Sequence, residues 1–446
     1  MGHDLTFENT CRMYTAPILT YYVWWVLREA KKRNIDRLYF LARDGSIMKK
    51  IAELLCEEFC IPISCRYLYV SRAALRMPTY HFIDENEAYS LLLGYSYQVS
   101  AASMMKRALL PENLIDRILD EVGYPREKRA ILLTRMETDR LAEQIKENGT
   151  YRDAVWSASE RAYPLAMDYF RQEGLLDKDV TVAIVDSGWN GSMQRSLRQL
   201  LDRTGCTNRL VGFYFGLFYE PSHNNNSEYL TWYFSPTKAL ANKVKFSNNL
   251  FECICAAPHG TTLGYMRESG RVRPILGKSP SEHQNDFVRH QIKTVLQEVP
   301  NIIKGQSLDS LDEDAAFRKT QHLVRKLMYA PTKDIVDGFK TMLFCDDIYE
   351  SYYANLADTE QFHRFRSYTV LSRIRESLRR SGKAETDIPW PYGVAALLPP
   401  VESWWYRSNI LAWELLKNSP ARMVYKKLSS SAQAINNKIT HKNTPR

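Results

Sequence analysis

A short polar stretch, Asp186 to Ser192, holds the residues best suited to chemistry, in the order Asp-Ser-Gly-Trp-Asn-Gly-Ser. It follows five apolar or β-branched residues, Thr181–Val185, a pattern typical of a strand buried on both faces. An acid at the end of such a strand is costly unless it is hydrogen-bonded or meets a ligand. Glycines in the turn let backbone amides approach a ligand closely. The pattern predicts a site for a phosphate or a sugar phosphate.

Each residue of this stretch has an expected role. Asp186 is the candidate catalytic residue and would hold sugar hydroxyls or a metal ion. Ser192 is expected to cap the following helix, whose amino end attracts anions. The other substrate-binding candidates are Gly188, Trp189, Asn190 and Gly191. The alternative is a capped turn in which Trp189 only covers the core.

A second polar turn, Arg43-Asp44-Gly45-Ser46, follows the apolar run 37–42 and leads into a helical pattern. We expect Arg43 to pair with phosphate, Asp44 and Gly45 to shape the turn, and amides up to Ser46 to point at the ligand. The alternative is a tight turn in which Asp44 caps the helix and Arg43 is ion-paired. Arg72, after a third apolar run, is a further substrate-binding candidate or one half of a surface ion pair.

Four strands are expected to position these residues, over 37–42, 66–71, 181–186 and 210–217. Strands that alternate with helices indicate a mainly parallel, Rossmann-like sheet in an α/β fold. Open sheets of this kind bind ligands at the carboxyl ends of their strands. Both polar turns are therefore expected at the same edge of one sheet.

The pattern of residue types along the chain indicates four segments. The sheet domain takes 1–77 and 176–276, a helical insertion takes 78–175, and a helical C-terminal region with a basic tail takes 277–446. The apolar run at 16–27 is about half the length of a membrane-spanning helix, so it is expected to be a buried helix. The 260–276 segment is expected to add strands to the sheet domain.

Composition narrows the class of protein. The 446 residues are 45% hydrophobic and 25% charged, which is typical of a globular protein. The net charge of +9 permits anionic partners, but no motif indicates specific nucleic-acid binding. The eight cysteines contain no CxxC pair and are expected to be reduced thiols in a cytoplasmic protein. The Glu252–Cys255 segment and His259 are expected to be structural.

The C-terminal segment combines Trp404, Trp405 and Trp413 with a run of basic residues. Aromatic and basic residues together favour contact with a membrane surface. The alternative is ordinary packing of the tryptophans, followed by a disordered end.

Three segments carry a resemblance to a known family: YFLARDGSIM (Tyr39–Met48), YLYVSRAAL (Tyr67–Leu75) and VDSGWNGSMQ (Val185–Gln194). They resemble the region after the HAD domain in bacterial proteins of capsule and O-antigen clusters, which are identified as HAD-superfamily hydrolases. The resemblance implies a role in cell-surface polysaccharide biosynthesis. A HAD nucleophile motif follows a strand, whereas the matching residues here, Asp177–Thr181, precede one. The hydrolase activity that the resemblance implies is therefore without a credible nucleophile motif in this chain.

The order of elements also resembles that of type I phosphoribosyltransferases. The resemblance implies that Arg43-Asp44-Gly45 occupies the pyrophosphate turn and that Asp186–Ser192 occupies the phosphoribosyl diphosphate loop. Two departures are clear, because the usual acidic pair is reduced to Asp186 and the loop is one residue short. A transferase activity of this kind is an expectation from the resemblance alone.

We expect a protein that binds a phosphorylated sugar or nucleotide-sugar and that can catalyse phosphoryl or glycosyl transfer through positioning and charge stabilisation. The residues name no cofactor, and Mg²⁺ is the metal ion to test. The alternative is a non-catalytic adaptor. Its C-terminus would dock on a membrane-bound glycosyltransferase or on anionic lipid.

Overall fold

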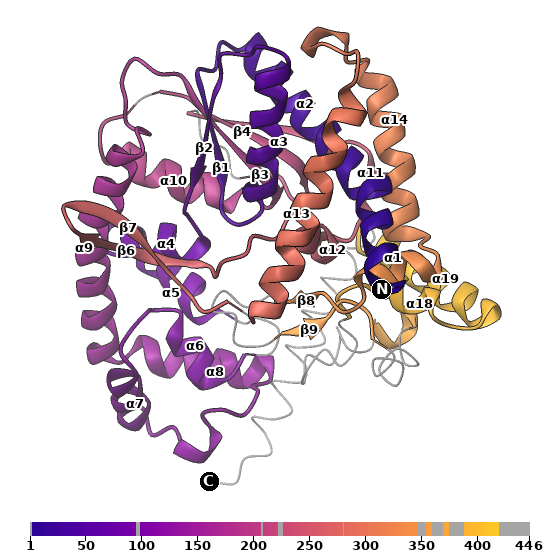
Figure 1. The fold of residues 1–446 in the computed structure, drawn as a ribbon. Coiled ribbons are helices and arrows are strands. Elements are labelled where there is room, and N and C mark those ends of the chain that lie inside the picture. The colour runs from indigo at the N-terminus through magenta and orange to yellow at the C-terminus, as the bar shows by residue number, and fades with distance from the viewer. Residues whose placement is uncertain are drawn as a thin grey trace.

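Five parallel strands form the central sheet, in the spatial order β2-β1-β3-β4-β5 (Figure 1). The strands are β1 (Arg37–Leu41), β2 (Ser64–Leu68), β3 (Val182–Trp189), β4 (Leu210–Leu217) and β5 (Ser227–Phe234). The computed structural model describes residues 2–94, 99–206, 208–221, 226–279, 281–345, 353–358, 369–373 and 388–418. All four predicted strands lie in this sheet, and the predicted α/β fold with a parallel sheet is confirmed.

Two details of the sheet differ from the prediction. The strand expected over 66–71 ends at Leu68, because the Ser71 hydroxyl accepts a hydrogen bond from the Ala74 N–H and begins a helix. β5 has no counterpart among the predicted strands. It lies at the edge of the sheet, where its first five residues are only half-buried and its sequence mixes polar and aromatic residues.

Side chains of the central strands alternate between two hydrophobic cores. Leu38, Phe40 and Val185 belong to the larger core on one face, whereas Tyr39 and Ile184 belong to the core on the other. A parallel sheet covered on both faces needs apolar residues throughout its strands. This is why β1 and β3 read as unbroken apolar runs.

Helices cover both faces of the sheet. The helices that contribute buried residues to the larger core are α1 (Gly2–Thr10), α2 (Ala16–Lys32), α3 (Gly45–Glu58), α12 (Asn248–Ile254), α13 (Glu282–Ile303), α14 (Glu313–Val324), α15 (Lys333–Phe339), α18 (Pro391–Ala396) and α19 (Pro400–Lys417). The other core takes α4 (Arg72–Arg76), α9 (Gly149–Gln172) and α10 (Ser192–Asp202). The C-terminal helices therefore share a core with the sheet.

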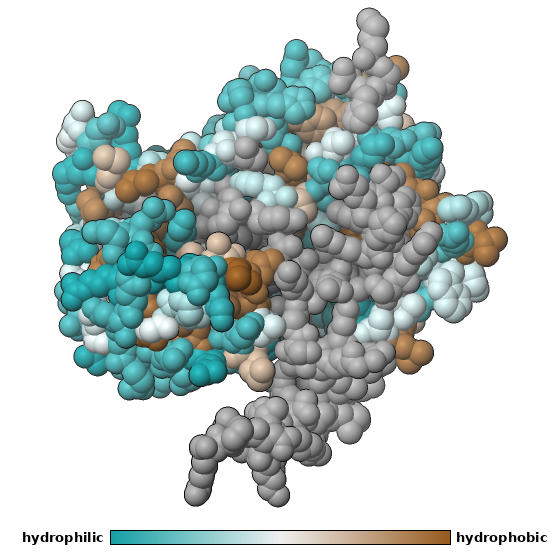
Figure 2. Space-filling model, turned by 90° about the horizontal axis from the view of Figure 1, so that it is seen from below, coloured by the Kyte–Doolittle hydropathy of each residue, from teal (hydrophilic) through white to brown (hydrophobic). Residues whose placement is uncertain are grey.

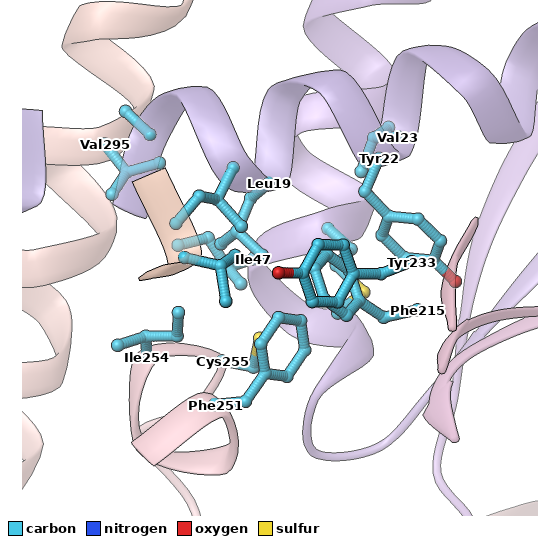
Figure 3. Close-up of a cluster of buried hydrophobic side chains, with 14 of the residues drawn as sticks. Leu19, Tyr22, Val23, Ile47, Phe215, Tyr233, Phe251, Ile254, Cys255 and Val295 are labelled. Atoms are coloured by element: carbon cyan, nitrogen blue, oxygen red, sulfur yellow. The ribbon is translucent and has the colours of Figure 1, made fainter. Parts of the chain in front are cut away.

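Helix α2 lies at the centre of the larger core, as the apolar run at 16–27 predicts. Figure 3 shows its residues Leu19, Tyr22 and Val23 among side chains from α3, α12, α13, β4 and β5. The Tyr22 ring meets Phe215 edge-on at 5.4 Å, and its hydroxyl donates to the carbonyl oxygens of Asp186 (3.0 Å) and Phe213 (2.9 Å). None of the described helices has the length and apolar content needed to cross a membrane.

The expected helical insertion contains α5 (Glu85–Leu93), α6 (Ala101–Lys106), α7 (Glu112–Glu121), α8 (Arg135–Lys146) and all of α9. These helices enclose a hydrophobic core of their own. α8 begins at Arg135, because Thr134 forms a capping box with Glu137. In Figure 2 this part of the molecule lies at the left and has a mainly hydrophilic surface.

Shorter elements complete the fold. β6 (Thr262–Glu268) and β7 (Arg271–Leu276) form a separate antiparallel hairpin against α4 and α9, so the 260–276 segment does not extend the main sheet. α11 (Leu240–Lys243) follows β5. The C-terminal region is not wholly helical, because β8 (Leu343–Phe344) pairs with β9 (Ala354–Asn355). The expected disordered end lies outside the described residues.

Candidate functional site

A cavity of about 460 Å³ opens at the carboxyl ends of β1 and β3. The connection from β1 leads to β2 on one side, whereas β3 leads to β4 on the other. The crevice between β1 and β3 is therefore the point at which the direction of winding reverses, where open α/β sheets bind ligands. Both predicted polar turns reach this cavity, through Arg43–Asp44 and Asp186–Asn190.

Two acids lie together at the floor of the cavity. Asp186 is only 9% exposed, and burial, followed by the negative charge of Asp44, raises its pKa to about 8. Burial also raises the pKa of Asp44 to about 6, although a hydrogen bond from Ser187 and the charges of Arg43 and Arg72 oppose this. At neutral pH the site therefore holds one mainly protonated and one mainly ionised carboxyl group.

The Asp44 carboxylate accepts a hydrogen bond from the Ser187 hydroxyl and does not cap α3. This contact joins the β1–α3 turn to the end of β3. Asp44 is therefore a candidate acid–base residue, a role that we did not expect from the sequence. One feature of the sequence could have indicated this role, because Asp44, like Asp186, lies close to the end of an apolar strand.

The other three residues of the turn, Arg43, Gly45 and Ser46, lie in different places. Arg43 lines the cavity. Gly45 does not line it and lies against β1, where an added Cβ would stand 2.6 Å from the Phe40 carbonyl carbon. Ser46 lines a second groove, between α3 and α13. Only Arg43 and Asp44 of this turn therefore line the cavity, and the Ser46 amide, expected to point at the ligand, instead donates to the Arg43 carbonyl oxygen at 3.0 Å.

Trp189 packs against aromatic side chains, as the alternative of a turn in which it covers the core predicts. Its ring lies 5.3 to 5.7 Å from the rings of Phe218, Phe246 and Phe251, and its Nε1–H donates to Glu252 at 2.7 Å. These contacts hold it at a φ of 74°, an uncommon value for a bulky residue. Trp189 therefore fixes the wall of the cavity and also lines it.

The two glycines of the second turn are required by the backbone. Gly188 has a φ of 120°, and an added Cβ would lie 2.2 Å from the Gly216 carbonyl oxygen. Gly191 has a φ of 61° and is itself the N-cap of α10, so the expected cap at Ser192 is wrong. Ser192 is the first residue of the helix, and it lines the cavity together with Asn190.

Arg72 lines the cavity from the first turn of α4, and the neighbouring Ser71 caps that helix. Three further lining residues, Lys243, Asn248 and Glu252, come from the segment after β5. Their positions had no sequence signal, because they depend on where the chain returns after the unpredicted strand. Lys243 donates to the Phe218 carbonyl at 2.7 Å. Glu414, Lys417 and Asn418 of the C-terminal region also line the cavity.

The acid pair suits a divalent cation only in combination with a ligand. Among the described residues, no group of three or more His, Cys, Asp or Glu side chains is placed to hold a metal ion. Mg²⁺, however, is commonly held by one or two carboxylates together with substrate phosphates. Asp44 and Asp186 fit this second mode.

The HAD-like residues lie at the opposite edge of the sheet, as expected. Asp177 pairs with Arg37 at 2.9 Å, at the start of β1. The cavity is thus the site at which the predicted ligand-binding residues converge. Compared with known proteins, the chain matches no family model and no curated sequence.

Proposed function

We propose that the sheet-edge cavity binds a phosphorylated sugar or a nucleotide-sugar. The observation that carries the proposal is the convergence of Arg43–Asp44 and Asp186–Asn190 in one cavity at the reversal point of the sheet. Its volume of about 460 Å³ lies within the usual range for small-molecule sites, roughly 300–1,000 Å³. The two polar turns would otherwise have no reason to place charged residues at the same edge.

The charges of the cavity suit a phosphorylated ligand. Arg43 and Arg72 provide guanidinium groups for phosphate oxygens. Asp186 and Asp44 would bind sugar hydroxyls, or would hold Mg²⁺ jointly with a phosphate. When bound, Mg²⁺ would supply charge neutralisation for the phosphate oxygens.

The reaction that we propose is phosphoryl or glycosyl transfer. Two carboxyl groups whose environments separate their pKa values can divide the roles of acid and base. Asp44, mainly ionised at pH 7, would accept a proton from an attacking hydroxyl, and Asp186, mainly protonated, would donate one to a leaving group. The resemblance of the two turns to polysaccharide-cluster proteins supports the proposal that this activity belongs to surface-polysaccharide biosynthesis.

Arg43→Gln is expected to weaken binding of a sugar phosphate about ten- to a hundredfold, since a hydrogen bond to a charged group contributes about 1.5–3 kcal/mol. Thermal shift with glucose 1-phosphate and with UDP-glucose, each with and without MgCl₂, measures this. Arg171→Gln is the matched control, because Arg171 pairs with Asp168 on the surface of α9. Equal ligand responses in wild type and Arg43→Gln would contradict the proposal.

A second candidate function, docking on a membrane or a membrane protein, is favoured by the surface of α19. Trp404 is 69% exposed and Trp405 is 54% exposed, with Val401 beside them. Trp413 does not belong to this surface, because it is buried and Arg373 lies over its ring. The expected basic residues after 418 lie outside the described residues.

Replacing Trp404 and Trp405 by serine together is expected to reduce sedimentation with vesicles that contain phosphatidylserine, with no loss of melting temperature. Removal of 404–446 would be a poor test, because Tyr406 and Ile410 are part of the core. Vesicles of phosphatidylcholine alone provide the control. Equal sedimentation of the two proteins would leave the tryptophans without a membrane role.

A further inference from the structure

Three arginines extend the positive charge of the site beyond the cavity itself. Arg72 and Arg76 stand on α4, and Arg195 stands in the first turns of α10. The two helices pack against each other, and α4 lies just past the carboxyl ends of the strands, between the sheet and helices α5 and α6 (Figure 1). Arg72 also lines the cavity.

Two buried arginines in the described part of the chain have acidic partners. Arg198, 1% exposed, is ion-paired with Asp202, and Arg129 is paired with Asp116 and Asp120. Such pairing is the rule, because a buried charge without a partner is costly.

Arg76 departs from this pattern. It is half-buried, and its guanidinium makes no hydrogen bond or ion pair with the residues that the structure describes. Burial lowers its pKa to about 10; Tyr80 opposes the fall, and the positive charges of Arg72, Arg195 and Arg107 add to it.

The side chain of Arg195 also lacks a partner among the described residues. It is half-buried, and its guanidinium makes no ion pair or hydrogen bond with any of them. Its Nε atom is buried without a partner, as are those of Arg129 and Arg198, but these two arginines have ion pairs and Arg195 has none. Arg107, by contrast, is tied to the carbonyl oxygens of Leu92 and Gly94. Arg72, which is exposed, and the half-buried Arg76 and Arg195 therefore form a group of like charges, close enough for Arg72 and Arg195 both to act on Arg76.

We propose that Arg72, Arg76 and Arg195 form a subsite for a second phosphate group of the ligand. This inference rests on the proposed function, because Arg72 joins the subsite to the sheet-edge cavity. Guanidinium groups bind phosphate oxygens in pairs of parallel hydrogen bonds, and three of them suit a dianion. With Arg43, which also lines the cavity, the ligand class narrows to molecules with more than one phosphate, such as a nucleoside diphosphate-sugar.

Inorganic pyrophosphate is the probe, followed by calorimetric titration and by thermal shift at constant ionic strength. Arg76→Gln and, separately, Arg195→Gln are expected to weaken pyrophosphate binding at least tenfold. Without the anion, each variant should melt at the same temperature as wild type or higher, because a like-charge repulsion is removed. A lower melting temperature with an unchanged pyrophosphate response would overturn the subsite and make these arginines structural.

Arg198→Gln is the matched control, since that arginine has its partners within the protein. It should lose melting temperature and keep its response to pyrophosphate. Failure of wild type to bind pyrophosphate would overturn the subsite. If pyrophosphate binding depends on Arg76 but no sugar phosphate binds, the subsite stands and the proposed function fails. If Arg43→Gln alone loses the sugar phosphate, the function stands and the subsite fails.

Discussion

Asp186→Asn is expected to make the ligand-free protein more stable at pH 8, although it alters the centre of the proposed site. Burial and the charge of Asp44 raise the pKa of Asp186 from 3.8 to about 8. The folded protein therefore retains a proton that the unfolded chain releases, so wild-type stability falls as pH rises from about 4 to about 8. Asparagine has no proton to lose. At about 1.4 kcal/mol for each pKa unit, the gain at pH 8 is about 3–5 kcal/mol.

Chemical unfolding of both proteins between pH 5 and 8.5 measures this effect. The difference in free energy of unfolding should grow with pH and level off above pH 8. Asp179→Asn is the control, because Asp179 is exposed and its variant should follow wild type at every pH. A constant difference between Asp186→Asn and wild type would show that Asp186 is held as a stable anion, and the assignment of acid and base would then fail.

Gly188→Ala is expected to destabilise the protein by about 3 kcal/mol or more, from backbone strain and a steric clash together. Gly188 has a φ of 120°, and the new Cβ would lie 2.2 Å from the Gly216 carbonyl oxygen. Gly188 pairs with Gly216 in the register of β3 and β4, so relief of the clash must separate the ends of these strands. That movement displaces Asp186 and Asn190, and the response to sugar phosphates should be lost as well.

Gly205→Ala separates the two causes. Gly205 has a φ of 72°, but an added Cβ there would have nothing within 4 Å. This variant should lose only about 1 kcal/mol, the cost of the left-handed conformation, and its ligand response should be intact. Urea unfolding of both variants decides the point. Equal losses would mean that contact with Gly216 plays no part.

The sheet and the meeting of its polar turns could be predicted because the relevant signals are local. Buried parallel strands such as Leu38–Leu41 and Ala183–Val185 are apolar without interruption, and each ends in a charged residue within a few positions. Parallel strands carry their carboxyl ends to one edge. The placement of Arg43 and Asp186 in one cavity followed from these two facts.

The remaining parts of the site depend on contacts that no local pattern records. Trp189 has its packing partners directly after β4 (Phe218), on α12 (Phe251) and between the two elements (Phe246). Asp44 meets Ser187 from 143 positions away. Lys243 and Glu252 reach the cavity only because the chain adds β5 before turning back. The sequence prediction of a cap at Ser192 failed because Gly191, with a positive φ, already ends the turn.

The residues that line the cavity are synthesised at widely separated times, because they come from distant parts of the chain. The acid pair needs only β1 and β3, and these strands are complete once residue 189 has been synthesised. Lys243 and Glu252 follow, and Glu414, Lys417 and Asn418 come last. Chains are synthesised at about 5–20 residues per second, so on the order of ten seconds or more separate the synthesis of the two acids from that of Glu414, Lys417 and Asn418. The lining of the cavity is therefore complete only after residue 418 has been synthesised.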